Sequence, residues 1–96
     1  MEIDKSVDGT TVTIKASGKL DSIGAPEFSQ ATEGIAEGMT SVIMDFENVN
    51  YVSSAGLRAV LKLKMSTKKG TDVYIINATG MTAELFKTAG FGSLLK

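Results

Sequence analysis

Ser53 and Ser54 are the residues of this chain whose type and position best suit chemistry. They follow a polar stretch and stand at the start of a helix predicted from about Ala55. A helix start leaves backbone N–H groups free and carries partial positive charge, so it stabilises an anion. A serine there can cap the helix, contributing about 1 kcal/mol, and the same position tolerates a phosphate group well. Residue type alone therefore predicts either a simple cap or a phosphate acceptor.

Several kinds of chemistry are excluded by what the sequence lacks. The chain has no Cys and no His, which removes disulfides, thiol nucleophiles, imidazole bases and the usual nitrogen- and sulfur-ligated zinc sites. A carboxylate-only metal site and a hydroxyl assisted by Lys or Asp stay open. No phosphate-binding glycine loop, catalytic triad or evident acid–base pair is present. We therefore expect no enzyme, no catalytic residue, no metal and no cofactor, and a nucleotide-binding module or small hydrolase has little support.

The near-neutral total charge conceals an uneven distribution. Ten Lys and Arg against eleven Asp and Glu give a formal net charge of −1, so no global positive field recruits nucleic acid. Residues 1–48 hold nine acidic and three basic side chains, whereas residues 49–96 hold two acidic and seven basic ones. Most of the positive charge falls on the helix expected at 55–69, with no aromatic residues interleaved. We expect no nucleic-acid partner.

Length and hydropathy are typical of one small folded domain. The 96 residues, 43% hydrophobic and 22% charged, predict a single domain over residues 1–96. The longest apolar runs have only a few residues, and four of the first six residues are charged or polar. Neither a membrane span nor a signal peptide fits this pattern, so we expect no membrane partner and a cytoplasmic location.

Hydrophobic patterning predicts the strands that position the two serines. Alternating runs at about 1–7 and 11–20 are joined by Asp8-Gly9, which is typical of a hairpin turn. Nearly continuous apolar runs at 41–46 and 73–76 indicate strands covered by helices, which favours a parallel or mixed sheet. The polar residues after position 46 then form a loop at the carboxyl end of a strand, where open α/β sheets place their sites.

Three helices are predicted around these strands. The first begins near Pro26 and ends at Gly38, the second spans about 55–69, and the third spans about 81–89. Residues 91–95 supply a final edge strand or a packing tail. We expect an α/β fold with a mixed central β-sheet of four to five strands and helices packed on it, in the order β-β-α-β-α-β-α-(β). Met44 and Met65 are expected in the core.

The stretch Val49-x-Tyr51-Val52-Ser53-Ser54-Ala55-Gly56-Leu57-Arg58, after a strand ending Asp45-Phe46, resembles the signature of STAS domains. This family joins sulphate transporters with anti-sigma factor antagonists. The resemblance covers most of the chain. At the end of the second predicted strand, Gly18-Lys19-Leu20-Asp21 resembles the family's Gly-x-Leu-Asp. The next helix opens in the way familiar from the family, with Ala25-Pro26-Glu27-Phe28. The family's Leu-rich last helix, which ends in Gly and a hydrophobic residue, is matched by Leu85-Phe86-Lys87-Thr88-Ala89-Gly90-Phe91.

The resemblance implies an anti-sigma factor antagonist, also called an anti-anti-sigma factor. Such a protein binds an anti-sigma factor serine/threonine kinase in a partner-switching system and so releases the sigma factor. The kinase inactivates it by phosphorylating a serine, and a PP2C-type phosphatase reverses the switch. Ser54 matches the acceptor, with Ser53 as the alternative because it stands where many members carry Asp. The partner-binding residues implied are Asp21, Ser53, Ala55, Gly56 and Arg58.

Other interpretations of the chain and of its site residues stay open. The chain could be an accessory STAS subunit or scaffold of a signalling or lipid-transport complex, without phosphorylation, and Ser54 would then be only a cap. Asp21 either docks the kinase or stabilises a turn. Gly56 either leaves the acceptor accessible or lets the helix pack closely on a strand, and Arg58 either pairs with a phosphate or faces an acidic partner.

Overall fold

The secondary structure follows the predicted order. All of residues 1–96 are described by the structure, a computed structural model. The elements are β1 (Glu2–Asp8), β2 (Thr11–Leu20), α1 (Gly24–Ala31), β3 (Ser41–Val52), α2 (Ser54–Met65), β4 (Asp72–Ile76), α3 (Gly80–Thr88) and a short 3-10 helix, η1 (Gly92–Leu94).

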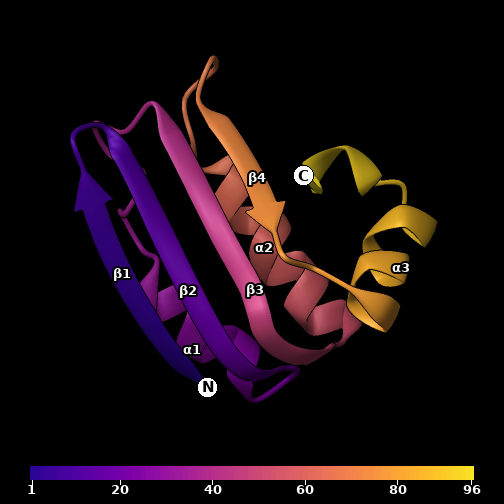
Figure 1. The fold of residues 1–96 in the computed structure, drawn as a ribbon. Coiled ribbons are helices and arrows are strands. Elements are labelled where there is room, and N and C mark those ends of the chain that lie inside the picture. The colour runs from indigo at the N-terminus through magenta and orange to yellow at the C-terminus, as the bar shows by residue number, and fades with distance from the viewer.

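The four strands form one mixed sheet in the order β1-β2-β3-β4. β1 pairs with β2 in antiparallel fashion, whereas β2, β3 and β4 are parallel neighbours. A helix connects each pair of parallel strands: α1 connects β2 to β3, and α2 connects β3 to β4. α1 and α2 lie side by side against one face of the sheet (Figure 1). α3 and η1 lie beyond β4. The predicted α/β class and mixed sheet are confirmed.

The core lies between the sheet and its helices. It contains eighteen buried hydrophobic residues in one cluster. Three phenylalanines connect its parts, because Phe46 of β3 lies 6.5 Å from Phe28 of α1 and 6.4 Å from Phe86 of α3, measured between ring centroids. Such edge and tilted contacts are favourable arrangements for aromatic rings. α3 is therefore fixed to the same core as α1.

The first helix is shorter than predicted. It ends at Ala31 rather than at Gly38, and residues 32–38 form turns. Gly34 has a φ of 71°, which lies outside the right-handed helical region. The Thr32 hydroxyl donates to the Phe28 carbonyl oxygen at 2.8 Å and closes the helix. Ile35, expected on the helix stripe, packs on the core from these turns.

The third strand is longer than predicted. It continues to Val52, so residues 47–52 are strand rather than a polar loop. The pairing with β2 shifts register twice, between Lys15 and Ser17 and between Gly18 and Lys19, and each shift leaves an extra residue in β3. These bulges break the alternation of buried and exposed residues, which concealed the strand in the sequence.

Further boundaries and one core assignment also differ from expectation. α2 spans Ser54–Met65 instead of 55–69, because the Ser66 and Thr67 hydroxyls bond to carbonyl groups of its last turn. A single bridge between Ile75 and Leu95 replaces the optional fifth strand. Met44 is buried as predicted. The prediction that Met65 lies in the core is wrong, because this last residue of α2 has 84% of its surface exposed. None of the helices has the length and apolar character needed to span a membrane.

Candidate functional site

The carboxyl ends of β2 and β3 bring the singled-out residues to one edge of the sheet. The two strands are parallel and end in register at Leu20 and Val52. The backbone N–H of Ser53 then donates to the Leu20 carbonyl oxygen at 3.0 Å. The loop that begins with Asp21 and the start of α2 therefore lie next to each other, although more than thirty positions separate them in the sequence.

The two adjacent serines have different structural roles. Ser53 is the N-cap of α2: its backbone is extended, and its hydroxyl oxygen accepts from the Gly56 N–H at 3.3 Å. Ser54 is the first helical residue, its side chain is exposed, and its hydroxyl makes no hydrogen bond within the chain. The capping role that the sequence left open between them belongs to Ser53, and Ser54 presents a free hydroxyl beside the positive end of the helix.

Gly56 packs α2 against the end of β2. A Cβ atom at this position would overlap the Leu20 carbonyl oxygen and lie 2.8 Å from the Leu20 Cγ. Gly56 is buried and its backbone is helical, so it is close approach that requires glycine here. Of the two roles considered for Gly56, helix–strand packing is the one for which the structure shows a contact.

Gly24 plays the same part at the start of α1, and sequence reasoning missed it. A Cβ atom on Gly24 would overlap the carbonyl oxygen of Lys19, the residue before Leu20. The last two residues of β2 therefore lie directly against the first turns of both helices. A glycine in the first turn of each crossover helix was the signal available in the sequence.

Asp21 organises the turn between β2 and α1. One carboxylate oxygen accepts from the backbone N–H groups of Ile23 at 3.0 Å and of Gly24 at 2.9 Å. These bonds, Gly24 first and Ile23 second, lower the pKa of Asp21 below its ordinary value of 3.8 because they stabilise the charged form. The structure thus shows the turn role considered for Asp21, at an edge where the side chain remains partly accessible.

Ala55 and Arg58 complete the first turn of α2. Ala55 is half-buried and packs against the core, whereas Arg58 is exposed, one turn after Ser54 on the same face of the helix. Arg58 makes no ion pair, since the one salt bridge of the chain joins the Met1 amine to Glu27. No group of three or more acidic side chains in the structure is arranged to hold a metal ion.

Asp45 lies apart from the serines. Its carboxylate accepts from the Glu47 N–H and from the Asn77 side-chain amide, each at 3.0 Å. Asn77 has a φ of 63° and begins the connection from β4 to α3. Asp45 therefore stabilises both the β4–α3 connection and the part of β3 that directly follows it.

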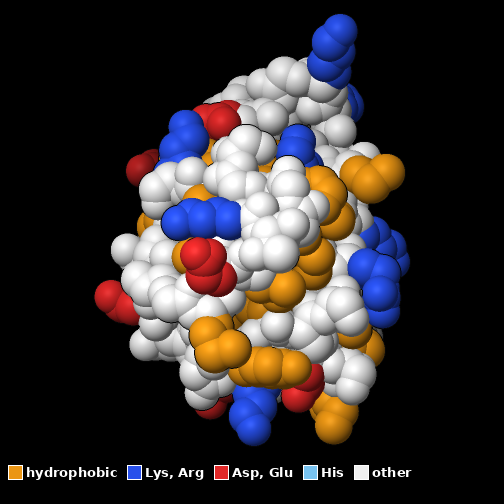
Figure 2. All heavy atoms as spheres, turned by 90° about the vertical axis from the view of Figure 1, so that its right-hand side faces the viewer, with side chains coloured by type: hydrophobic (Ala, Val, Ile, Leu, Met, Phe, Trp, Pro, Cys, Tyr) orange, Lys and Arg blue, Asp and Glu red, His pale blue; other side chains and the backbone are white.

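Exposed apolar side chains follow the ends of all three parallel strands. Ile23, Tyr51 and Met81 expose 76%, 49% and 87% of their surfaces. They belong to the loop after β2, the end of β3 and the start of α3, and so to the edge of the sheet that carries Ser54. Figure 2 shows the side of the molecule that carries α3, and hydrophobic side chains gather in the lower half of this view. An apolar surface marks a protein–protein contact site when it is contiguous.

Comparison with known proteins assigns the chain to a family. The model of the STAS domain family matches residues 2–96. The chain belongs to the STAS domain family. The resemblance inferred from the serine stretch is confirmed, and its match spans the sheet and all the helices described above.

Relatives of this STAS domain include anti-sigma factor antagonists. An anti-sigma-B factor antagonist of Staphylococcus aureus is 25% identical over 97 residues, covering 99% of this chain and 90% of the relative. An anti-sigma factor antagonist from Mycobacterium paratuberculosis has the same fold, with a TM-score of 0.88 at 18% identity, over 98% of this chain and 81% of that one. The phosphorylated form of the Bacillus cell fate determinant SpoIIAA matches with a TM-score of 0.76 at 20% identity, over 99% and 89% of the two chains.

Proposed function

We propose that this STAS domain is an anti-sigma factor antagonist that is inactivated by phosphorylation of Ser54. It binds an anti-sigma factor serine/threonine kinase and so releases the sigma factor, and a PP2C-type phosphatase restores it. The observation that carries the proposal is the free, exposed hydroxyl of Ser54 at the start of α2, on an edge with apolar side chains around it. The domain then works as a regulator in the cytoplasm. It is not itself an enzyme, because the kinase and the phosphatase carry out the phosphate transfer and its reversal.

The position of Ser54 suits a switch that changes binding without changing the fold. A phosphate adds a charge of about −1.5 to −2, and a helix start stabilises an anion by about 0.3–2 kcal/mol. In an interface the same charge must be desolvated, which costs several kcal/mol if it is unpaired. Since about 1.4 kcal/mol changes affinity tenfold, one phosphate is sufficient to release the partner.

The hydrogen bonds favour Ser54 over Ser53 as the acceptor. The Ser53 hydroxyl already receives the Gly56 N–H and lies half-buried, whereas the Ser54 hydroxyl is unengaged and exposed. Transfer of phosphate to Ser53 would have to disrupt the cap of α2. In this chain Ser53 supplies the cap of α2.

The proposed partner surface surrounds Ser54. Asp21, in the loop after β2, and Arg58, one turn after Ser54, offer charges of opposite sign, and Ser53 and Ala55 flank Ser54 in the sequence. Gly56 is buried, so it contributes by holding this turn against Leu20. The exposed apolar residues Ile23, Tyr51 and Met81 are additional contact candidates.

Phosphosite mapping tests the proposal. The domain is incubated with ATP and each anti-sigma factor kinase of its own organism, and peptides are analysed by mass spectrometry. We expect phosphate on Ser54 that is absent from Ser54→Ala and retained in Ser66→Ala, a serine substitution outside this edge. Phosphate on Ser53 alone would reassign the acceptor, and phosphate on neither serine would overturn the switch.

The same experiment addresses an accessory or scaffold role. If the domain co-purifies with subunits of a signalling or lipid-transport complex and no kinase modifies it, the phosphorylation cycle is refuted and Ser54 is only the first residue of a capped helix.

A further inference from the structure

A groove separates α1 from α2 on the face of the helices away from the sheet. Its volume is about 450 Å³, and eight of the ten residues that line it are not hydrophobic. Small-molecule sites span about 300–1,000 Å³. The groove runs along α1 from Pro26 and along the carboxyl half of α2 from Ala59. Ser54, at the amino end of α2, does not line it, so this is a different region from the proposed phosphorylation site.

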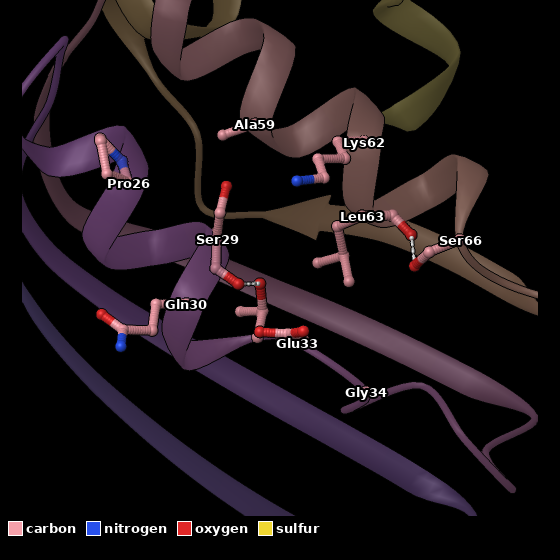
Figure 3. A pocket seen from close by; sticks show the side chains of 10 residues that line it. Pro26, Ser29, Gln30, Glu33, Gly34, Ala59, Lys62, Leu63 and Ser66 are labelled. Carbon is pink, nitrogen blue, oxygen red and sulfur yellow. Dashed lines mark hydrogen bonds between the residues drawn. The ribbon is translucent and has the colours of Figure 1, made fainter.

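The polar groups of the groove fall into two sets. The hydroxyls of Thr32 and Ser66 are engaged, since they donate to backbone carbonyls at 2.8 and 2.7 Å. The side chains of Ser29, Glu33 and Lys62 make no hydrogen bond within the chain. In Figure 3 the Lys62 amine extends from α2 toward Ser29 on α1, and the Glu33 carboxylate lies further along the α1 side.

Lys62 and Glu33 are opposite charges that line one groove without pairing. The one salt bridge of the chain is elsewhere, so the ammonium and carboxylate groups are more than the 4.0 Å contact distance apart. The carbonyl ends of α1 and α2 also point toward this region and place partial negative charge near Glu33. The groove therefore offers one position for an anionic group, at Lys62 and Ser29, and one for a cationic group, at Glu33.

We propose that this groove binds a small zwitterion of the amino acid class. The ligand carboxylate is bound by the Lys62 ammonium and the Ser29 hydroxyl, and the ligand ammonium by the Glu33 carboxylate. A ligand with both groups satisfies both charges at once, whereas a simple anion meets the negative helix ends and a simple cation meets Lys62. This binding is additional to the proposed phosphorylation switch and does not depend on it.

A titration followed by two-dimensional 15N–1H NMR tests the proposal on the full 96-residue chain. The proteinogenic L-amino acids are added one at a time to about 10 mM, because a groove with exposed charges binds in the range of roughly 0.1–1 mM. We expect at least one amino acid to give saturable shifts confined to residues 26–34 and 59–66. Absence of a saturable shift for every amino acid would overturn the proposal.

Matched variants and half-ligands locate the charges. We expect Lys62→Met and Glu33→Gln each to weaken binding about tenfold, as loss of one charge-assisted contact does. Lys69→Met and Glu37→Gln remove charges outside the groove and should leave the affinity unchanged. Acetate and ethylamine should each bind much more weakly than the amino acid. Equal binding of acetate, or equal losses in the control variants, would refute a zwitterion site.

Ser54→Ala separates this test from that of the switch. We expect the variant to bind the amino acid with unchanged affinity, because Ser54 does not line the groove. Loss of amino acid binding in Ser54→Ala would contradict the independence of the two regions, whatever the kinase experiment shows.

Discussion

The two ends of the α1–α2 pair are built in opposite ways. At the amino ends, Gly24 and Gly56 let both helices touch the last residues of β2, and no space is left between helix and strand. Further along, the same two helices leave between them the groove that Lys62 and Glu33 line. Close packing fixes the geometry of the turn before Ser54, whereas the open end leaves charged groups without partners. One helix pair thus provides a rigid surface suited to a protein partner and a hollow suited to a small ligand.

The largest expected effect breaks the packed end. Gly56→Ala places a Cβ against the Leu20 backbone, which cannot move as a flexible side chain can. Overpacking of this kind destabilises by about 1–3 kcal/mol or more. We expect a lower urea midpoint with an unchanged slope.

Gly92→Ala is the matched control for that measurement. A Cβ there would meet the flexible Lys87 side chain at 3.4 Å and no backbone atom closer than that. We expect its free energy of unfolding to stay within about 0.5 kcal/mol of the parent protein. If Gly56→Ala is equally mild, the contact with Leu20 does not require glycine.

The second prediction separates charge from packing at the Ser54 edge. Ser54→Ala should retain kinase affinity, while Ser54→Asp should lower it about tenfold or more, because a charge must be desolvated in the interface. Neither variant should unfold at a lower urea concentration than the parent, because the helix start tolerates the added charge. Calorimetric titration with the purified kinase gives the affinities, and unchanged values for both variants would place the interface elsewhere.

The third prediction distinguishes the two serines by stability. Ser53→Ala removes the cap of α2 and should reduce the free energy of unfolding by about 0.5–2 kcal/mol. Ser53→Asp should restore most of it, because Asp also caps helices and its charge suits the helix start. Ser54→Ala is the control, with little change expected. Urea denaturation of the three variants shows whether Ser53 or Ser54 carries the cap.

The smallest expected effect concerns Asp21 and pH. Its folded-state pKa is lowered by the N–H groups of Gly24 and Ile23, so its contribution to stability is present above the ordinary value of 3.8. It is lost as the pH falls through the lowered folded-state pKa. We expect Asp21→Asn to flatten the decline of stability at acid pH. Asp4→Asn, on the exposed strand β1, should leave that decline as it is.

The sequence predicted the sheet, the element order and the place of the serines because those signals are local. Continuous apolar runs mark β3 and β4, and two hydroxyls before an apolar helix mark the start of α2. The end of α1 was mispredicted because Ile35 keeps helical spacing although Gly34 turns the chain out of the helix. The length of β3 was concealed by two bulges, which put Asn48 and Asn50 in the strand.

The division of labour within the site depends on three-dimensional contacts. Ser53 and Ser54 are identical in type, so only the hydrogen bond from Gly56 identifies the cap. Gly56 meets the end of β2 from a helix more than thirty positions later in the sequence, and the residue pattern of that helix does not indicate the contact. The groove arises from how α1 and α2 lie relative to each other, which residue types alone do not determine.

The contact of Phe46 with rings from both α1 and α3 has a consequence for amide exchange. β3 is paired with a strand on each side along Ser41–Asp45, and just beyond it Phe46 lies beneath two helices that are distant in sequence. No local fluctuation of one helix frees these amides, so they should exchange with deuterium only when the whole domain opens. The amides of Met44 and Asp45 should therefore report the global free energy of unfolding, while those of β1 exchange by smaller openings.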